Sequence, residues 1–203
     1  MKKNLYIFRH GETDYNVEKR MQGCLDIPLN ANGIAQAQQL AQKLSNIKFD
    51  CVFSSPLSRA LETAKIAIKN CKIITDDKLQ EWNLGIFCGK IIHATDEPAN
   101  TPVDMTQDII NVPLALLSDD DYIPDGGESH NMFKQRINDA IIHIAKNTDA
   151  ENIGIATHGG VIRFLVKRFG DFKYPKNGIP NAEYLTMQWD GNRLCIPKKP
   201  DWA

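Results

Sequence analysis

Short apolar runs recur along the chain, separated by longer segments in which apolar residues return every three to four positions. Runs rich in β-branched and aromatic residues are typical of buried strands. The predicted strands are 5–8, 51–54, 72–75, 152–157, 184–189 and 193–196. The last two flank Asp190-Gly191-Asn192, a sequence typical of a hairpin turn.

The segments between these runs predict four amphipathic helices. Their apolar stripes are Ile34, Ala37, Ala41 and Leu44; Leu57, Ala60, Leu61, Ala64 and Ile68; Phe133, Ile137, Ala140, Ile141 and Ile144; and Ile162, Leu165, Val166 and Phe169. We expect the second helix to open at Ser55-Pro56, because Ser can cap a helix and Pro suits its first position. Gly170 is expected to end the last helix.

Strands that alternate with helices predict an α/β fold. The expected architecture is a three-layer sandwich, with a mostly parallel central sheet and helices on both faces. The 203 residues, of which 42% are hydrophobic, can bury one sizeable core, so we expect a single domain over 1–203. Ligands of such sheets bind beyond the carboxyl ends of the strands, which is where a site is expected.

Residues 91–128 differ from the rest of the chain in charge. They include nine acidic side chains and no Lys or Arg, so they carry −9 while the remainder carries +8 within a net charge of −1. Prolines at 98, 102, 113 and 124 divide the segment into short pieces. Such segments are ordinarily solvated loops. We interpret this one as an acidic, lid-like insertion in the domain.

Composition excludes several classes of protein. With 24% charged residues and no apolar run of bilayer length, we expect neither disorder nor a membrane partner. The N-terminus lacks signal-peptide features and the five cysteines include no C-x-x-C pair, so reduced thiols and a cytoplasmic location are expected. The absence of metal-ligand motifs and of a basic-aromatic stripe predicts no metal, no cofactor and no nucleic-acid partner. The oligomeric state is left open.

Side chains that suit phosphoryl transfer follow the predicted strands. They are Arg9 and His10 after the first strand, Arg59 on the helix after the second, Glu81 after the third and His158 at the end of the fourth. Two guanidiniums can hold phosphate oxygens in bidentate fashion, and helix starts at Ser55 and at Gly159-Gly160 would add backbone donors. A neutral imidazole can attack phosphorus, and a carboxylic acid can protonate the departing oxygen.

An ordered series of motifs covers most of the chain. It consists of Arg9-His10-Gly11-Glu12-Thr13 with Asn16, Gln22-Gly23, Asp26-Ile27-Pro28-Leu29, Gly33, Ser54-Ser55-Pro56-Leu57-Ser58-Arg59-Ala60 with Thr63-Ala64, Leu79-Gln80-Glu81 with Gly85, Gly127-Glu128-Ser129, and Thr157-His158-Gly159-Gly160. In this order the series resembles the histidine phosphatase superfamily, also called phosphoglycerate mutase-like proteins. Tyr15 departs from the pattern, because Trp is common there in the family.

The resemblance implies a role for each matching residue. His10 would be the phosphorylated nucleophile and Glu81 the proton donor, with Glu12 and Glu128 as rival acids. The implied phosphate contacts are Arg9, Arg59 and His158, and the implied lining of the phosphate pocket is Asn16, Gln22, Gly23 and the Gly159 backbone.

The expected function is a phosphomonoesterase that acts through phosphohistidine on a small phosphorylated metabolite, without a metal. The alternatives are a cofactor-dependent phosphoglycerate mutase and a phosphate-binding module without turnover. The chain length and Gly127-Glu128-Ser129 resemble the broad-specificity and alpha-ribazole phosphatases. If 91–128 lies over the pocket, its charge would repel multiply charged anions, and a monophosphate on a neutral or cationic body would be preferred.

Overall fold

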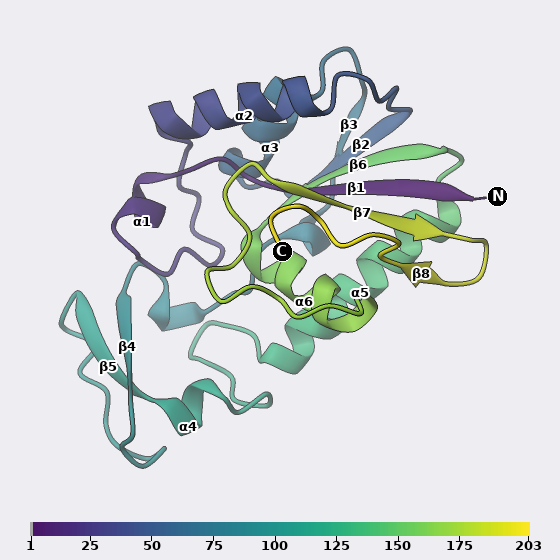
Figure 1. The fold of residues 1–203 in the computed structure, drawn as a ribbon. Coiled ribbons are helices and arrows are strands. Elements are labelled where there is room, and N and C mark those ends of the chain that lie inside the picture. Colours follow the sequence, from purple (N-terminus) through teal and green to yellow (C-terminus); the bar gives the residue numbers. More distant parts are fainter. Residues whose placement is uncertain (1) are drawn as a thin grey trace.

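A six-stranded sheet forms the centre of the protein in a computed structural model that describes residues 2–203 (Figure 1). Its order is β3 (Ile73–Thr75), β2 (Cys51–Ser54), β6 (Asn152–Thr157), β1 (Lys3–Arg9), β7 (Tyr184–Trp189) and β8 (Leu194–Cys195). The strands from β3 to β1 run parallel, and β7 and β8 add an antiparallel edge. All six predicted strands are thus confirmed, and β2, β6 and β7 have the predicted bounds.

Helices cover both faces of this sheet, as Figure 1 shows. Helices α2 (Ala31–Lys43) and α3 (Ser58–Ala67) lie on one face, and α5 (His130–Asn147) and α6 (Gly159–Phe169) lie on the other. Because strand side chains alternate between faces, Leu5 and Ile7 of β1 pack in the core under α5 and α6, while Phe8 packs in the core under α2 and α3. The three-layer α/β sandwich is confirmed.

The buried face of α2 differs from the predicted stripe. Leu40 is fully buried together with Ala37, whereas Ile34 and Ala41 are half-buried. Leu40 follows the polar residues Gln38 and Gln39, and the predicted stripe did not include it. Gly33 completes this face because the backbone of Glu12 leaves no space for a Cβ there.

The predicted start of α3 at Ser55-Pro56 is wrong. The helix begins at Ser58, whose N–H donates to a carboxylate oxygen of Asp26 at 2.7 Å. Asp26 comes from a distant loop, so a tertiary contact supplies the cap that the local sequence suggested for Ser55. The Ser55 hydroxyl points elsewhere and approaches His158.

Residues 91–113 form a second, two-stranded parallel sheet beside the main body. It pairs β4 (Ile91–Thr95) with β5 (Ile109–Pro113), and the four-residue helix α4 (Leu114–Leu117) follows. Leu84, Phe87, Ile110 and Val112 form its own small core. Figure 1 shows this part projecting to one side of the main sheet. The two strands were not predicted, because the flanking prolines and acidic residues indicated loops.

Three short elements complete the described chain. These are helix α1 (Asp14–Val17) and the 3-10 turns η1 (Asp77–Leu79) and η2 (Gly85–Phe87). The five cysteines are free thiols. Within residues 2–203, no helix combines the length and apolarity needed to cross a bilayer.

Candidate active site

The predicted site residues meet where β1, β2 and β6 end. Arg9 lies opposite Thr157 in the parallel register, and the N–H of His10 donates to the carbonyl of Thr157 at 3.0 Å. The ring of His158, the next residue, therefore lies beside that of His10, with their centroids 5.2 Å apart. The site thus forms at the carboxyl edge of the sheet, as the strand order requires.

A cavity of about 440 Å³ opens at this edge. The predicted residues on its wall are Arg9, His10, Asn16, Gln22, Gly23, Arg59, Glu81 and Gly159. His158 lies behind this wall, fully buried against His10. Residues far apart in the sequence therefore surround one space.

His10 has the geometry of a nucleophile. Its Nδ1 lies 2.7 Å from the carbonyl oxygen of Gly11, and because a carbonyl only accepts, Nδ1 carries the hydrogen. The lone pair is then on Nε2. Burial, followed by the positive charges of Arg9 and Arg59, holds the pKa of His10 well below its usual range. The imidazole is therefore neutral near pH 7.

The hydrogen bond between Ser55 and His158 bears on which ring nitrogen of His158 carries the proton. The Ser55 Oγ lies 2.8 Å from His158 Nε2 and accepts a hydrogen bond from the N–H of Leu57 at 3.3 Å. The buried hydroxyl has no other acceptor among the described residues, which favours donation to Nε2 and the His158 tautomer with its proton on Nδ1. Burial, and then the charge of Arg59, lowers the pKa of His158 well below its usual range, so this ring is also neutral.

The two arginines are held by carbonyl groups rather than by carboxylates. Arg59 is fully buried and donates to the carbonyls of Leu25 and Gly23 at 2.6 and 2.8 Å. Arg9 donates to the carbonyl of Ile179 at 2.6 Å. Neither arginine is in an ion pair within the described chain, and burial lowers the pKa of both. A fully buried and a half-buried positive charge, neither of them in an ion pair within residues 2–203, favour the binding of an anion.

Three buried N–H donors of this site have no partner among residues 2–203. They are the Nε of Arg9, the Nε of Arg59 and the Nδ1 of His158. A buried donor without an acceptor is unfavourable, so such donors are rare in stable structures. All three belong to groups around His10, and phosphate oxygens are acceptors that suit them.

Glu81 is the carboxylate of the cavity wall. Its Oε2 accepts from the N–H of Gly160 at 2.8 Å and its Oε1 from the N–H of Trp82 at 2.9 Å. A Cβ on Gly160 would lie 2.3 Å from Oε1, so this close approach requires glycine. The first turn of α6 thus holds the Glu81 carboxylate.

The rival acids lie outside the cavity wall. Glu12 accepts from the side-chain amides of Asn30 and Asn32, and Glu128 forms an ion pair with Arg136. Both carboxylates are thus occupied in contacts between loops and helices. Geometry favours Glu81 as the acid, and its role stays a prediction.

Two amides and a glycine complete the predicted phosphate pocket. The side-chain oxygen of Asn16 accepts from the N–H of Thr13, and that of Gln22 accepts from the Thr13 hydroxyl, so both NH₂ groups remain as donors. Gly23 adopts φ of 50°, the left-handed region that favours glycine, and this turns its carbonyl toward Arg59.

The acidic segment does not lie over the cavity. No residue of 91–128 lines the cavity wall, which instead adds three cations, Arg20, Arg163 and Lys176. Arg20 is paired with Glu18 and Asp108, whereas Arg163 and Lys176 form no ion pair within residues 2–203. The lining of the cavity therefore does not support the expected repulsion of multiply charged anions, although Asp108 of the acidic segment pairs with Arg20 on the wall.

Sequence reasoning missed part of the wall. Arg163 lies four residues after Gly159, and helical spacing on α6 was a signal for it. Tyr174, Lys176 and Ile179 come from a segment without strand or helix, for which periodicity offers no signal. Among residues 2–203, no three His, Cys, Asp or Glu side chains cluster in a way that suits a metal ion.

Comparisons with known proteins agree with this geometry. The family model described as histidine phosphatase superfamily (branch 1) matches residues 5–198. Phosphoglycerate mutase-like protein 4 of Arabidopsis thaliana is 36% identical over 197 residues, which are 95% of this chain and 82% of that protein. A metal-independent phosphoserine phosphatase of the same plant is 32% identical over 170 residues, 81% of this chain and 67% of that protein.

A solved structure agrees in fold. The alpha-ribazole phosphatase from Shigella flexneri superposes with a TM-score of 0.71 at 24% identity, covering 95% of this chain and 94% of that one. At this identity the likeness concerns the fold alone. With the family match over nearly the whole chain, it leads to one conclusion: the chain belongs to the histidine phosphatase superfamily.

Proposed function

We propose that the protein is a phosphomonoester hydrolase that forms phosphohistidine at His10 and needs no metal. One observation carries the proposal: the unpartnered donors of Arg9, Arg59 and His158 surround a neutral imidazole whose Nε2 lone pair is free. Three donors match the equatorial oxygens of a phosphoryl group under attack. The positive charge that a metal would supply comes from the two arginines.

The reaction proceeds in two displacements. His10 Nε2 forms a bond to phosphorus while the bond to the ester oxygen breaks, and Glu81 transfers a proton to the departing alkoxide. The Gly11 carbonyl accepts from Nδ1–H and stabilises the positive charge on the phosphorylated ring. Glu81, now a carboxylate, takes a proton from water as it attacks phosphorus. Inorganic phosphate leaves and His10 is regenerated.

The nucleophile is tested by trapping the intermediate. Brief mixing with substrate and an alkaline quench should leave one phosphoryl group on His10, labile to acid and stable to base. His10→Ala should lose both the label and turnover, on the order of 10³-fold or more. His143→Ala is the matched control, because His143 is exposed on α5 and contacts Asn147 rather than the site. A label on another residue type would overturn the proposal, as would loss of turnover in EDTA that zinc or magnesium restores.

A second candidate function, a phosphoglycerate mutase, is favoured by Arg163 and Lys176. These exposed cations of the cavity wall have no acidic partner among the described residues and suit a substrate carboxylate. The relatives named as phosphoglycerate mutase-like and phosphoserine phosphatase accord with such a substrate. We therefore include a small phosphorylated acid among the proposed substrates. The cytoplasmic location stays a separate prediction.

Two measurements separate these functions. With 3-phosphoglycerate, a hydrolase releases phosphate and a mutase forms 2-phosphoglycerate with little release. Phosphoserine and phosphoethanolamine differ only in a carboxylate, so a higher kcat/KM for phosphoserine that Arg163→Gln removes would assign that carboxylate to Arg163. Equal kcat/KM values for the two esters in the unmodified protein would exclude a carboxylate subsite.

A further inference from the structure

Glu81 belongs to a backbone segment that has no regular structure. It follows η1 and precedes η2, so no strand or helix provides partners for its carbonyl groups. Buried carbonyls need donors. Here side chains supply them: Thr157 Oγ1 donates to the carbonyl of Leu79 at 2.8 Å, and Cys24 Sγ donates to that of Glu81 at 3.3 Å.

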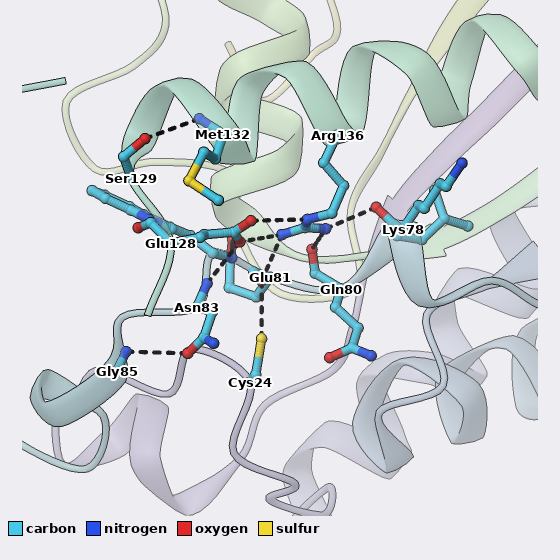
Figure 2. A network of polar contacts seen from close by, with 12 residues as sticks. Cys24, Lys78, Gln80, Glu81, Asn83, Gly85, Glu128, Ser129, Met132 and Arg136 are labelled. Carbon is cyan, nitrogen blue, oxygen red and sulfur yellow. Dashed lines mark hydrogen bonds and ion pairs between the residues drawn. The ribbon is translucent and has the colours of Figure 1, made fainter. Parts of the chain in front are cut away.

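Arg136 on α5 supplies the remaining donors. Its Nη1 donates to the carbonyls of Lys78 and Gln80 at 2.8 and 3.0 Å, and its Nη2 donates to that of Glu81 at 3.2 Å (Figure 2). One guanidinium thus contacts three carbonyls within four consecutive residues. The contact at Glu81 is to the residue whose side chain reaches the cavity.

Glu128 fixes Arg136 from the opposite side. Its carboxylate accepts from Nε of Arg136 at 3.1 Å and also from Nη2, and the pair is mostly shielded from solvent. The same carboxylate accepts from the N–H of Asn83 at 3.0 Å, and the Glu128 carbonyl accepts from the indole of Trp82 at 2.8 Å. Figure 2 shows Arg136 and Glu128 beside Gln80, Glu81 and Asn83.

We propose that Arg136, held by Glu128, is a positioning residue that sets the place of the Glu81 carboxylate. The inference rests on the proposed function, in which Glu81 is the proton donor. Proton transfer needs heavy atoms within about 2.6–3.2 Å, and a displacement of about 1 Å can lower a rate about 10²-fold. The backbone of Glu81 has no ladder to hold it, so its position depends on side-chain donors.

Lysine cannot replace arginine in this role. The guanidinium offers five N–H donors in a planar fork, and here they reach three carbonyls and a carboxylate at once. An ammonium group is a compact charge that would keep the attraction to Glu128 and lose most contacts to 78–81. Arg136→Lys therefore separates positioning from charge.

The test compares two leaving groups. Glycerol phosphate needs a proton on its departing oxygen, whereas p-nitrophenyl phosphate releases a stable phenolate. Arg136→Lys should lower kcat for glycerol phosphate by about 10²-fold and for p-nitrophenyl phosphate far less. Glu128→Gln should act in the same direction more weakly. Lys134→Gln is the matched control. Lys134 lies on the same helix as Arg136, and its substitution removes only an ion pair with Asp120, so neither rate should change.

A double variant distinguishes this inference from the proposed function. If Arg136 acts through Glu81, adding Arg136→Lys to Glu81→Gln should slow glycerol phosphate hydrolysis little further. Equal losses on both substrates for Arg136→Lys, or losses that multiply in the double variant, would overturn the inference alone. Equal losses on both substrates for Glu81→Gln would overturn the acid role of Glu81 and the inference with it. Thermal unfolding of each variant verifies that it folds.

Discussion

The active-site cavity and the acidic segment 91–128 both carry many charges, yet they differ in how those charges are solvated. Arg59 is fully buried, and Arg9 is half-buried, with its Nε shielded from solvent and unpartnered among the described residues. Asp104 and Asp119 are exposed. Electrostatic interactions are strong where water is excluded and screened at an exposed surface. The difference teaches that burial, and not only the net charge of a segment, sets how strongly a charge can act on an anion.

The acidic residues of 91–128 have local roles. Asp104 accepts from the N–H of Thr106 at 2.9 Å, and Asp119 accepts from that of Asp121 at 2.9 Å. These are turn contacts that Asp makes readily. Asp120 pairs with Lys134 and His130 at the surface of α5. These contacts account locally for several of the acidic side chains, and none of the nine lines the cavity.

The largest difference between the two regions is expected from Arg59→Lys. The change keeps the charge, but lysine cannot donate to Leu25 and Gly23 while presenting an N–H to phosphate. We expect kcat/KM for p-nitrophenyl phosphate to fall about 10²- to 10³-fold. Arg20→Lys is the control, because Arg20 lies on the same wall with surface acids as partners. A similar loss of kcat/KM in both variants would contradict the expectation that a buried arginine matters more than an exposed one.

An intermediate effect is expected from pH. The fold lowers the pKa of His10 and His158, so the unfolded chain takes up protons first as the pH falls. The stability that these neutral rings preserve is fully present above the ordinary histidine pKa of about 6.5. It is lost below it by up to about 1.4 kcal/mol per pH unit for each ring.

Urea unfolding in phosphate-free buffer at pH 7.5 and 5.5 measures this effect. The midpoint should fall at the lower pH, and it should fall less in His158→Asn. An identical pH dependence in both proteins would show that the buried rings do not carry it.

The smallest effect is expected in the acidic segment. Asp119→Asn with Asp121→Asn should change kcat/KM for 3-phosphoglycerate less than about twofold, at low and at high salt, because exposed charges away from the cavity are screened. This reverses the expectation that the charge of 91–128 repels multiply charged anions. A salt-dependent gain for the anionic substrate alone would restore that expectation.

The sequence predicted most of the sheet and the inner site. Strands such as 152–157 were predictable because their apolar runs are continuous, and His10 and His158 were expected to meet because they lie at the ends of two such strands. The start of α3 was not predictable, because its cap comes from Asp26 in another loop. Lys176 was not predictable either, because its segment has no period and only the folded chain brings it to the cavity.

The arginines of the cavity also affect the stability of the folded protein. Within the described chain, the hydrogen bonds of Arg9 and Arg59 go to carbonyl groups alone, and the lack of an ion-pair partner lowers the stability of the unliganded state. A ligand that binds only the native chain raises its stability, by about 2.7 kcal/mol at a hundredfold excess over its Kd. Inorganic phosphate, the product of the proposed reaction, would then also protect the protein from unfolding, and its lifetime would follow the phosphate supply around it.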